Sequence, residues 1–171
     1  MTEGQKTVAI GAASGVAAMV ALVALIYHIL PAHPESFATL GDRLTFALQM
    51  NVIAVIPLFG MLATVGNERF LGKAIDPLLH KEDTKMEIDG RVADNTLQQN
   101  LVFLIGTLAL STVLAPEHVR VILALAIVFV IARLVFWAGY RMHPLYRAPG
   151  MAATAYMNLG ILITVLYHMF F

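Results

Sequence analysis

The chain has 171 residues, of which 59% are hydrophobic and 13% are charged, and its formal net charge is +0. Soluble domains carry about 25% charged residues, so this composition indicates an integral membrane protein in contact with the lipid bilayer. The absence of net charge gives no bulk attraction to nucleic acid, and the absence of cysteine excludes disulfides, thiolate nucleophiles and cysteine metal ligands. The histidines lack HxxxH and HExxH spacing, so no metal site is predicted.

Five stretches are long and apolar enough to cross a bilayer, which takes roughly 20 mostly apolar residues. They are Val8–Leu30, Leu44–Val65, Val92–Leu114, Val119–Tyr140 and Met151–Phe170. The first has a longer apolar core than the roughly 7–15 residues of a signal peptide, so we expect an uncleaved helix. The predicted fold is an all-α membrane protein, with an N-terminal helix and its loop in residues 1–43 and a four-helix domain in residues 44–171.

Positive charge is unevenly shared between the two ends of the predicted spans. One end has only Arg43 and Arg120, and the other has nine cations. These nine are Lys6, Arg69, Lys73, Lys81, Lys85, Arg91, Arg133, Arg141 and Arg147. The positive-inside rule then predicts a cytoplasmic amino terminus and a carboxyl terminus on the far side. The pattern is compatible with a bacterial inner membrane or an endoplasmic reticulum membrane, and we favour the former.

Small and polar residues within the spans predict where helices meet. Gly11 and Gly15 have the spacing at which small residues let two membrane helices approach closely, although glycine is also common in such helices without this role. Asn158 is expected to bond to a neighbouring helix, and Pro57 is expected to kink the second span.

A polar row opens the third span, where hydrocarbon would favour apolar side chains. Arg91, Asn95 and Gln98 fall at positions i, i+4 and i+7 of a helix and therefore share one face. Buried polar groups are costly without partners, so the row indicates either a polar ligand or hydrogen bonds to another helix. Both interpretations stay open at this point.

A second polar cluster lies between the fourth and fifth spans. Tyr140 is near the end of one helix, and Arg147 directly precedes the start of the next, where Pro149 suits the first turn. An arginine beside the free N–H groups of a helix start favours anions. The alternative for Arg91, Arg141 and Arg147 is that their side chains extend to the membrane surface without binding a ligand.

These two motifs resemble the MAPEG family, the membrane-associated proteins in eicosanoid and glutathione metabolism. In that family one helix begins with Arg, Asn and Glu at the spacing that Arg91, Asn95 and Gln98 have here. A later Tyr and an Arg seven residues on correspond to Tyr140 and Arg147. The resemblance covers about residues 44–171, and the additional first span resembles the five-span bacterial and mattrin-like branch.

The resemblance implies a homotrimer that binds glutathione as co-substrate between neighbouring subunits, near the cytoplasmic side. Arg91, Asn95, Gln98 and Tyr140 would contact the tripeptide, and Arg147 would stabilise its thiolate, the nucleophilic form. Arginine suits the two carboxylates of glutathione because it forms bidentate hydrogen bonds with them.

Two residues depart from the family pattern. Gln98 replaces a glutamate and removes its negative charge, and Phe136 stands where eicosanoid enzymes often have a tyrosine. The family function is therefore one of two hypotheses. The chain is either a glutathione-dependent transferase or peroxidase acting on a lipophilic electrophile, or a non-catalytic membrane scaffold or binding protein that keeps the fold. Five spans are few for a transporter.

Overall fold

A computed structural model describes residues 1–72, 74–79 and 81–171, and within them five long helices dominate. These are α1 (Glu3–Ile29), α2 (Leu40–Leu71), α3 (Thr84–Val113), α4 (Val121–Met142) and α5 (Ala148–Phe170). Each helix, alone or with the short helical turn before it, is long and apolar enough to cross a membrane. The protein is therefore a multi-pass integral membrane protein, as the sequence predicted.

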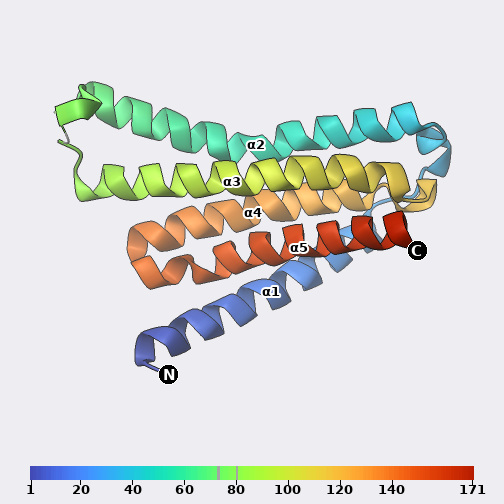
Figure 1. The fold of residues 1–171 in the computed structure, drawn as a ribbon, viewed down its shortest axis with the longest axis horizontal. Coiled ribbons are helices and arrows are strands. Elements are labelled where there is room, and N and C mark those ends of the chain that lie inside the picture. The colour runs from blue at the N-terminus through green and yellow to red at the C-terminus, as the bar shows by residue number, and fades with distance from the viewer. Residues whose placement is uncertain (73, 80) are drawn as a thin grey trace.

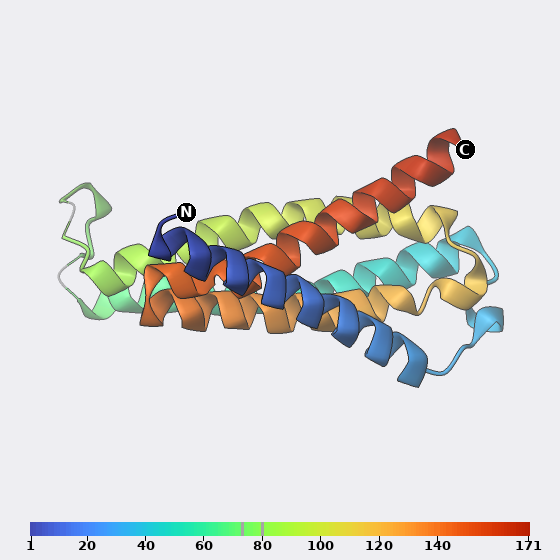
Figure 2. The ribbon, with the colours of Figure 1, turned by 90° about the horizontal axis from the view of Figure 1, so that it is seen from below.

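The helices run lengthwise, and consecutive helices point in opposite directions (Figure 1). The amino terminus, the α2–α3 connection and the α4–α5 turn lie at one end, and the carboxyl terminus lies at the other. Helix α1 crosses α5 near the start of α5, and the two helices then diverge toward the far end (Figure 2). This divergence leaves room between α1 and the rest of the bundle.

Polar caps extend three helices beyond their apolar cores. Thr2 and Thr39 form capping boxes at the starts of α1 and α2, and the Asp83 side chain accepts a hydrogen bond from the Met86 N–H at the start of α3. Such caps satisfy N–H groups that the first helical turn leaves free. Helix α3 consequently begins eight residues before the predicted Val92.

The glycine pair in α1 packs against the start of α5, which confirms the close approach expected from the spacing. A Cβ atom added at Gly15 would collide with the backbone of Pro149, and one added at Gly11 would lie 3.2 Å from Ala148 and Pro149 side-chain atoms. Glycine is required at position 15 because any side chain would push the two helices apart.

Two further expectations for the spans concern polar and kinked positions. Asn158 in α5 donates to the backbone and side-chain oxygens of Gln99 in α3, at 3.1 and 2.9 Å, which confirms the predicted interhelical bond. Pro57 lies inside α2, which bends near its middle (Figure 1). Proline removes one helical hydrogen bond, which accounts for a bend there.

The charged ends of the helices agree with the predicted grouping of cations. Lys6, Arg69, Lys85, Arg141 and Arg147 belong to helix ends that meet at the N-terminal end of the bundle (Figure 1). Lys73 lies outside the described residues. Which side of the membrane this end faces stays a prediction.

Candidate functional site

A cavity of about 580 Å³ lies at the N-terminal end of the bundle, between α1, α3, α4, α5 and the short turn before α5. Its lining includes Arg91, Asn95, Tyr140 and Arg147, four of the five residues predicted to form a site. We call it the polar cavity. Four helices and a turn thus bring together side chains from two motifs that are about 50 residues apart in the chain.

Arg147 is held at the junction of the α4–α5 turn and α5. It is the N-cap residue of α5, and its guanidinium carbon lies 4.9 Å from the centre of the Tyr140 ring. A Cβ at Gly139 would collide with the Tyr146 carbonyl, so this glycine lets the turn fold back against α4. The predicted position of Arg147 before the helix start is confirmed, and the Tyr140 ring presents a face that attracts its cation.

Arg91 and Asn95 both reach the polar cavity but already have partners within the chain. Arg91 Nη2 donates to Glu87 Oε1 at 2.7 Å, and both side chains are more than half exposed. Asn95 Oδ1 accepts a hydrogen bond from Arg133 Nη2 at 2.9 Å. An exposed ion pair contributes little stability, so Glu87 leaves Arg91 available to a stronger anionic partner.

Gln98 does not join the other four residues. Its side chain is exposed, and it is absent from the lining of the polar cavity. The helical spacing placed it on the same face as Arg91 and Asn95, but three residues beyond Asn95 the face has turned away from α4 and α5. Its predicted contact with a ligand therefore has no support in the structure of this chain.

Arg133 lies next to the polar cavity, where it bonds to Asn95. The sequence analysis counted it among the cations at one membrane side, but it lies inside the bundle. It is fully buried in the bundle, where Thr96 Oγ1 accepts from its Nε and Nη2 at 3.2 and 2.9 Å, and Thr154 Oγ1 accepts from Nη1 at 3.0 Å. Its guanidinium carbon also lies 4.1 Å from the Phe136 ring centre. Among the described residues it has no carboxylate partner. The sequence carries no distinct signal for this burial, because α2 and α5 also contain threonines that bond only within their own helix.

A buried carboxylate joins α3 to α4 near the polar cavity. Asp89, which the sequence analysis passed over, is fully buried and accepts from Trp137 Nε1 at 2.7 Å. It also accepts from Arg141 Nε and Nη2 at 2.8 and 2.5 Å. Two parallel N–H···O bonds between arginine and a carboxylate give a strong and directional contact. Arg141 and Trp137 are therefore fixed to α3.

The polar cavity has the chemistry of an anion site. Its lining offers two guanidinium groups, an amide and two phenols, and the described lining residues include no carboxylate. Val8 and Ala12 of α1 cover it on one side with apolar surface. Guanidinium groups beside a low-dielectric wall attract carboxylates and thiolates more strongly than they would in water. The chain has no cysteine, so a sulfur nucleophile at this site would have to come from a ligand.

The MAPEG family model matches residues 47–167, from α2 to α5. The chain belongs to the MAPEG family, which confirms the resemblance seen in the sequence. Helix α1 lies outside the matched residues, although it forms part of the polar cavity. The division of the chain at residue 43 stays a prediction.

Two curated relatives are similar over most of this chain. Transmembrane protein 79 of Mus musculus is 26% identical over 161 residues, which are 92% of this chain and 41% of the relative. Transmembrane protein 79 of Bos taurus is 24% identical over 144 residues, which are 84% of this chain and 36% of the relative. The chain thus spans about two fifths of the length of these relatives. No solved structure matches.

Proposed function

We propose that this MAPEG-family protein is a glutathione-dependent transferase or peroxidase that acts on a lipophilic electrophile. The observation that carries the proposal is the grouping of Arg91, Asn95, Tyr140 and Arg147 around one cavity without a carboxylate in its described lining. A volume of about 580 Å³ suits a tripeptide, since small-molecule sites span roughly 300–1,000 Å³.

Each residue has a separate task in the proposed site. Arg91 would exchange Glu87 for a carboxylate of the tripeptide, and the Asn95 amide would donate to its backbone while Arg133 holds the Asn95 oxygen. Arg147, with its side chain over the Tyr140 ring, would hold the sulfur as thiolate by its positive charge. Glutathione supplies the nucleophilic sulfur, which either displaces a leaving group from carbon or accepts the terminal oxygen of a hydroperoxide.

The proposal includes a homotrimer, which the family resemblance implies and which gives Gln98 a place. Because Gln98 is exposed in one subunit, its contact with the ligand would have to be made across a subunit boundary. The change Gln98→Glu is then expected to tighten glutathione binding in the trimer. Equal binding by this variant and the wild type would remove Gln98 from the proposed site.

One observation favours the non-catalytic alternative. Asn95, Thr96 and Thr154 all serve the buried guanidinium of Arg133, so part of the polar row stabilises helix packing. A protein that kept the fold as a membrane scaffold or binding protein would retain these contacts. It would have no need for Arg147, whose side chain is exposed and contacts the Tyr140 ring.

Glutathione binding to the purified chain in detergent, followed by calorimetry, tests the proposal. Arg147→Ala should weaken binding roughly 10–100-fold, the effect of losing one charge-assisted contact. Arg43→Ala is the matched control, because Arg43 donates to the Leu114 carbonyl at the opposite end of the bundle.

Turnover with an aryl halide and with an organic hydroperoxide then separates transferase from peroxidase. Glutathione binding that Arg147→Ala weakens and Arg43→Ala leaves unchanged supports the glutathione site. Absence of binding at several times the usual cellular glutathione concentration would leave the scaffold function as the better account.

A further inference from the structure

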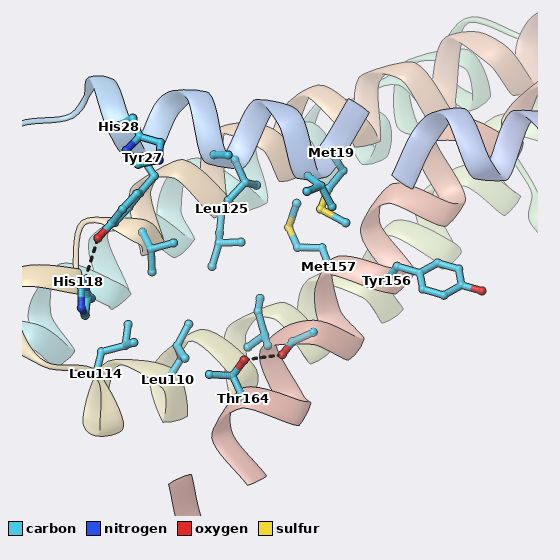
Figure 3. A pocket seen from close by; sticks show the side chains of 16 residues that line it. Met19, Tyr27, His28, Leu110, Leu114, His118, Leu125, Tyr156, Met157 and Thr164 are labelled. Atoms are coloured by element: carbon cyan, nitrogen blue, oxygen red, sulfur yellow. Dashed lines mark hydrogen bonds between the residues drawn. The ribbon is translucent and has the colours of Figure 1, made fainter. Parts of the chain in front are cut away.

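A second cavity, larger and more apolar, lies where α1 and α5 diverge. It has a volume of about 640 Å³ and is bounded by α1, α3, α4 and α5. Most of its lining is aliphatic or sulfur-containing, including Met19, Val23, Leu110, Leu125 and Met157 (Figure 3). We call it the apolar cavity. Because it lies between membrane-spanning helices, the molecules with direct access to it are those dissolved in the bilayer.

One end of the apolar cavity is polar. The Tyr27 hydroxyl lies 2.8 Å from His118 Nδ1, and this pair stands apart from the two methionines (Figure 3). His28 lines the same end. Arg120 is not part of the cavity lining, but its guanidinium carbon lies 4.4 Å from the centre of the Tyr27 ring.

Arg120 adds a positive charge near the polar end, and not all of its N–H groups have hydrogen-bond partners among the described residues. Its Nη1 donates to the Leu30 carbonyl at 2.6 Å, which ties the end of α1 to the start of α4. Its Nε is buried and has no hydrogen-bond partner among the described residues. The lining of the apolar cavity, as far as the structure describes it, contains two histidines and no carboxylate. The polar end is therefore suited to a negatively charged group.

We propose that the apolar cavity binds a single-chain amphiphile with a carboxylate headgroup, a fatty acid in chemical class. The headgroup would lie at Tyr27 and His118, and the hydrocarbon chain would run toward Met19 and Met157. When Tyr27 donates its hydroxyl proton to His118 Nδ1, the proton of the ring is on Nε2, which is then free to donate to the carboxylate. Methionine side chains are flexible and polarizable, so they adapt to a bent or straight chain.

This site goes beyond the proposed glutathione chemistry and does not require it. It depends on α1, which the MAPEG family match does not cover. Tyr156 nevertheless lines both the apolar and the polar cavity. The two cavities are therefore neighbours along α5, and the hydrocarbon chain would end near the wall that they share.

Photo-crosslinking of the whole purified chain with a palmitate analogue that carries a diazirine tests the site. Peptide mapping should place the label on residues 19–28 of α1 and residues 156–164 of α5. Unlabelled palmitate should compete, whereas hexadecanol, which has the same chain without the charge, should compete at least about tenfold less well.

Gly160→Leu is the variant that fills the cavity. An added Cβ at Gly160 has no heavy atom within 4 Å, so the change does not disturb helix packing, yet the longer side chain enters space that the ligand would occupy. Labelling should fall by about tenfold or more. Gly60→Leu in α2 is the matched control, because Gly60 is equally open and lies outside the apolar cavity.

Three results would overturn the proposal. Equal labelling of Gly160→Leu and wild type would show that the ligand does not occupy this cavity. Label spread over the outward faces of α2 and α5 would show adsorption to the lipid-facing surface. Competition by lysophosphatidylglycerol as strong as that of palmitate would refute the carboxylate headgroup. His118→Phe, which keeps a ring and removes the N–H, should abolish the preference for palmitate over hexadecanol.

Discussion

The buried guanidinium of Arg133 relies on hydroxyl groups in place of carboxylates, and this makes Thr154 a critical contact between α4 and α5. Thr154 Oγ1 accepts from Arg133 Nη1 at 3.0 Å and donates within its own helix to the Gly150 carbonyl at 3.1 Å. Thr154→Val keeps the shape of the side chain and removes only the oxygen. It therefore leaves a fully buried cation with one acceptor fewer.

The expected loss of stability follows from this single contact. A hydrogen bond to a charged group contributes about 1.5–3 kcal/mol. For a chain of this size, such a loss lowers Tm by roughly 3–12 °C. Arg133→Met removes the buried charge that Thr154→Val leaves with one acceptor fewer. The change does not strand the Thr96 hydroxyl, which still donates to the Val92 carbonyl at 2.7 Å. The double variant Arg133→Met/Thr154→Val should therefore show a favourable coupling of about 1–2 kcal/mol.

Thermal unfolding of the wild type, the two single variants and the double variant in one detergent measures this cycle. Unfolding is followed by intrinsic fluorescence and by the loss of the folded peak in size-exclusion chromatography. Thr112→Val is the control, since Thr112 is exposed and bonds only to the Ala109 carbonyl of its own helix. A Tm for Thr154→Val equal to that of the control would show that the Thr154 oxygen does not stabilise the buried guanidinium of Arg133. So would additive effects in the double variant, because they would mean that Thr154 and Arg133 do not act on each other.

Three further predictions concern the ion pair of Asp89, the packing of Gly15 and the orientation of the chain in the membrane. Asp89→Asn removes the buried charge that holds the arginine at the end of α4, and should cost about 1–3 kcal/mol in the same unfolding assay; an unchanged Tm would count against the bidentate pair. Gly15→Leu should destabilise the protein more than Gly60→Leu, because only the first places a side chain against another helix; equal Tm values would contradict the packing of α1 on α5. For orientation, the cysteine-free chain allows single labels: Gly4→Cys should be protected from a membrane-impermeant maleimide added outside intact cells, and Phe171→Cys should react. The opposite labelling pattern would reverse the predicted topology.

Much of the fold could be predicted because the bilayer constrains it. Apolar length defined the five spans, since a hydrocarbon core admits only helices with internally bonded backbones at this composition. Gly15 and Asn158 indicated helix contacts for a related reason, because small or polar residues inside a span are useful only against another helix. Arg147 could be placed at a helix start from Pro149 alone.

The helix ends were predicted less well, because polar caps carry no hydropathy signal. Helix α3 starts eight residues early because Asp83 caps it, and its first turns contain the Glu87–Arg91 ion pair. The hydropathy of these charged turns is too low for a membrane span, so the predicted span began only at Val92. The spacing rule also grouped Gln98 with Arg91 and Asn95, although Gln98 lies on the exposed side of α3 and outside the polar cavity.

The membrane class, the five helices, the family resemblance and the residue types available for an anion site all follow from the order of the amino acids. The burial of Arg133 against Thr96 and Thr154, the contact of Asp89 with the end of α4, and the place of α1 in the walls of two cavities emerge only once the helices pack. The physical reason is that helical periodicity fixes which side chains share a face but not which neighbour that face meets. The residues that bond to Arg133 and Arg141 are 21 to 52 positions away in the chain, and the packing of the helices brings them together.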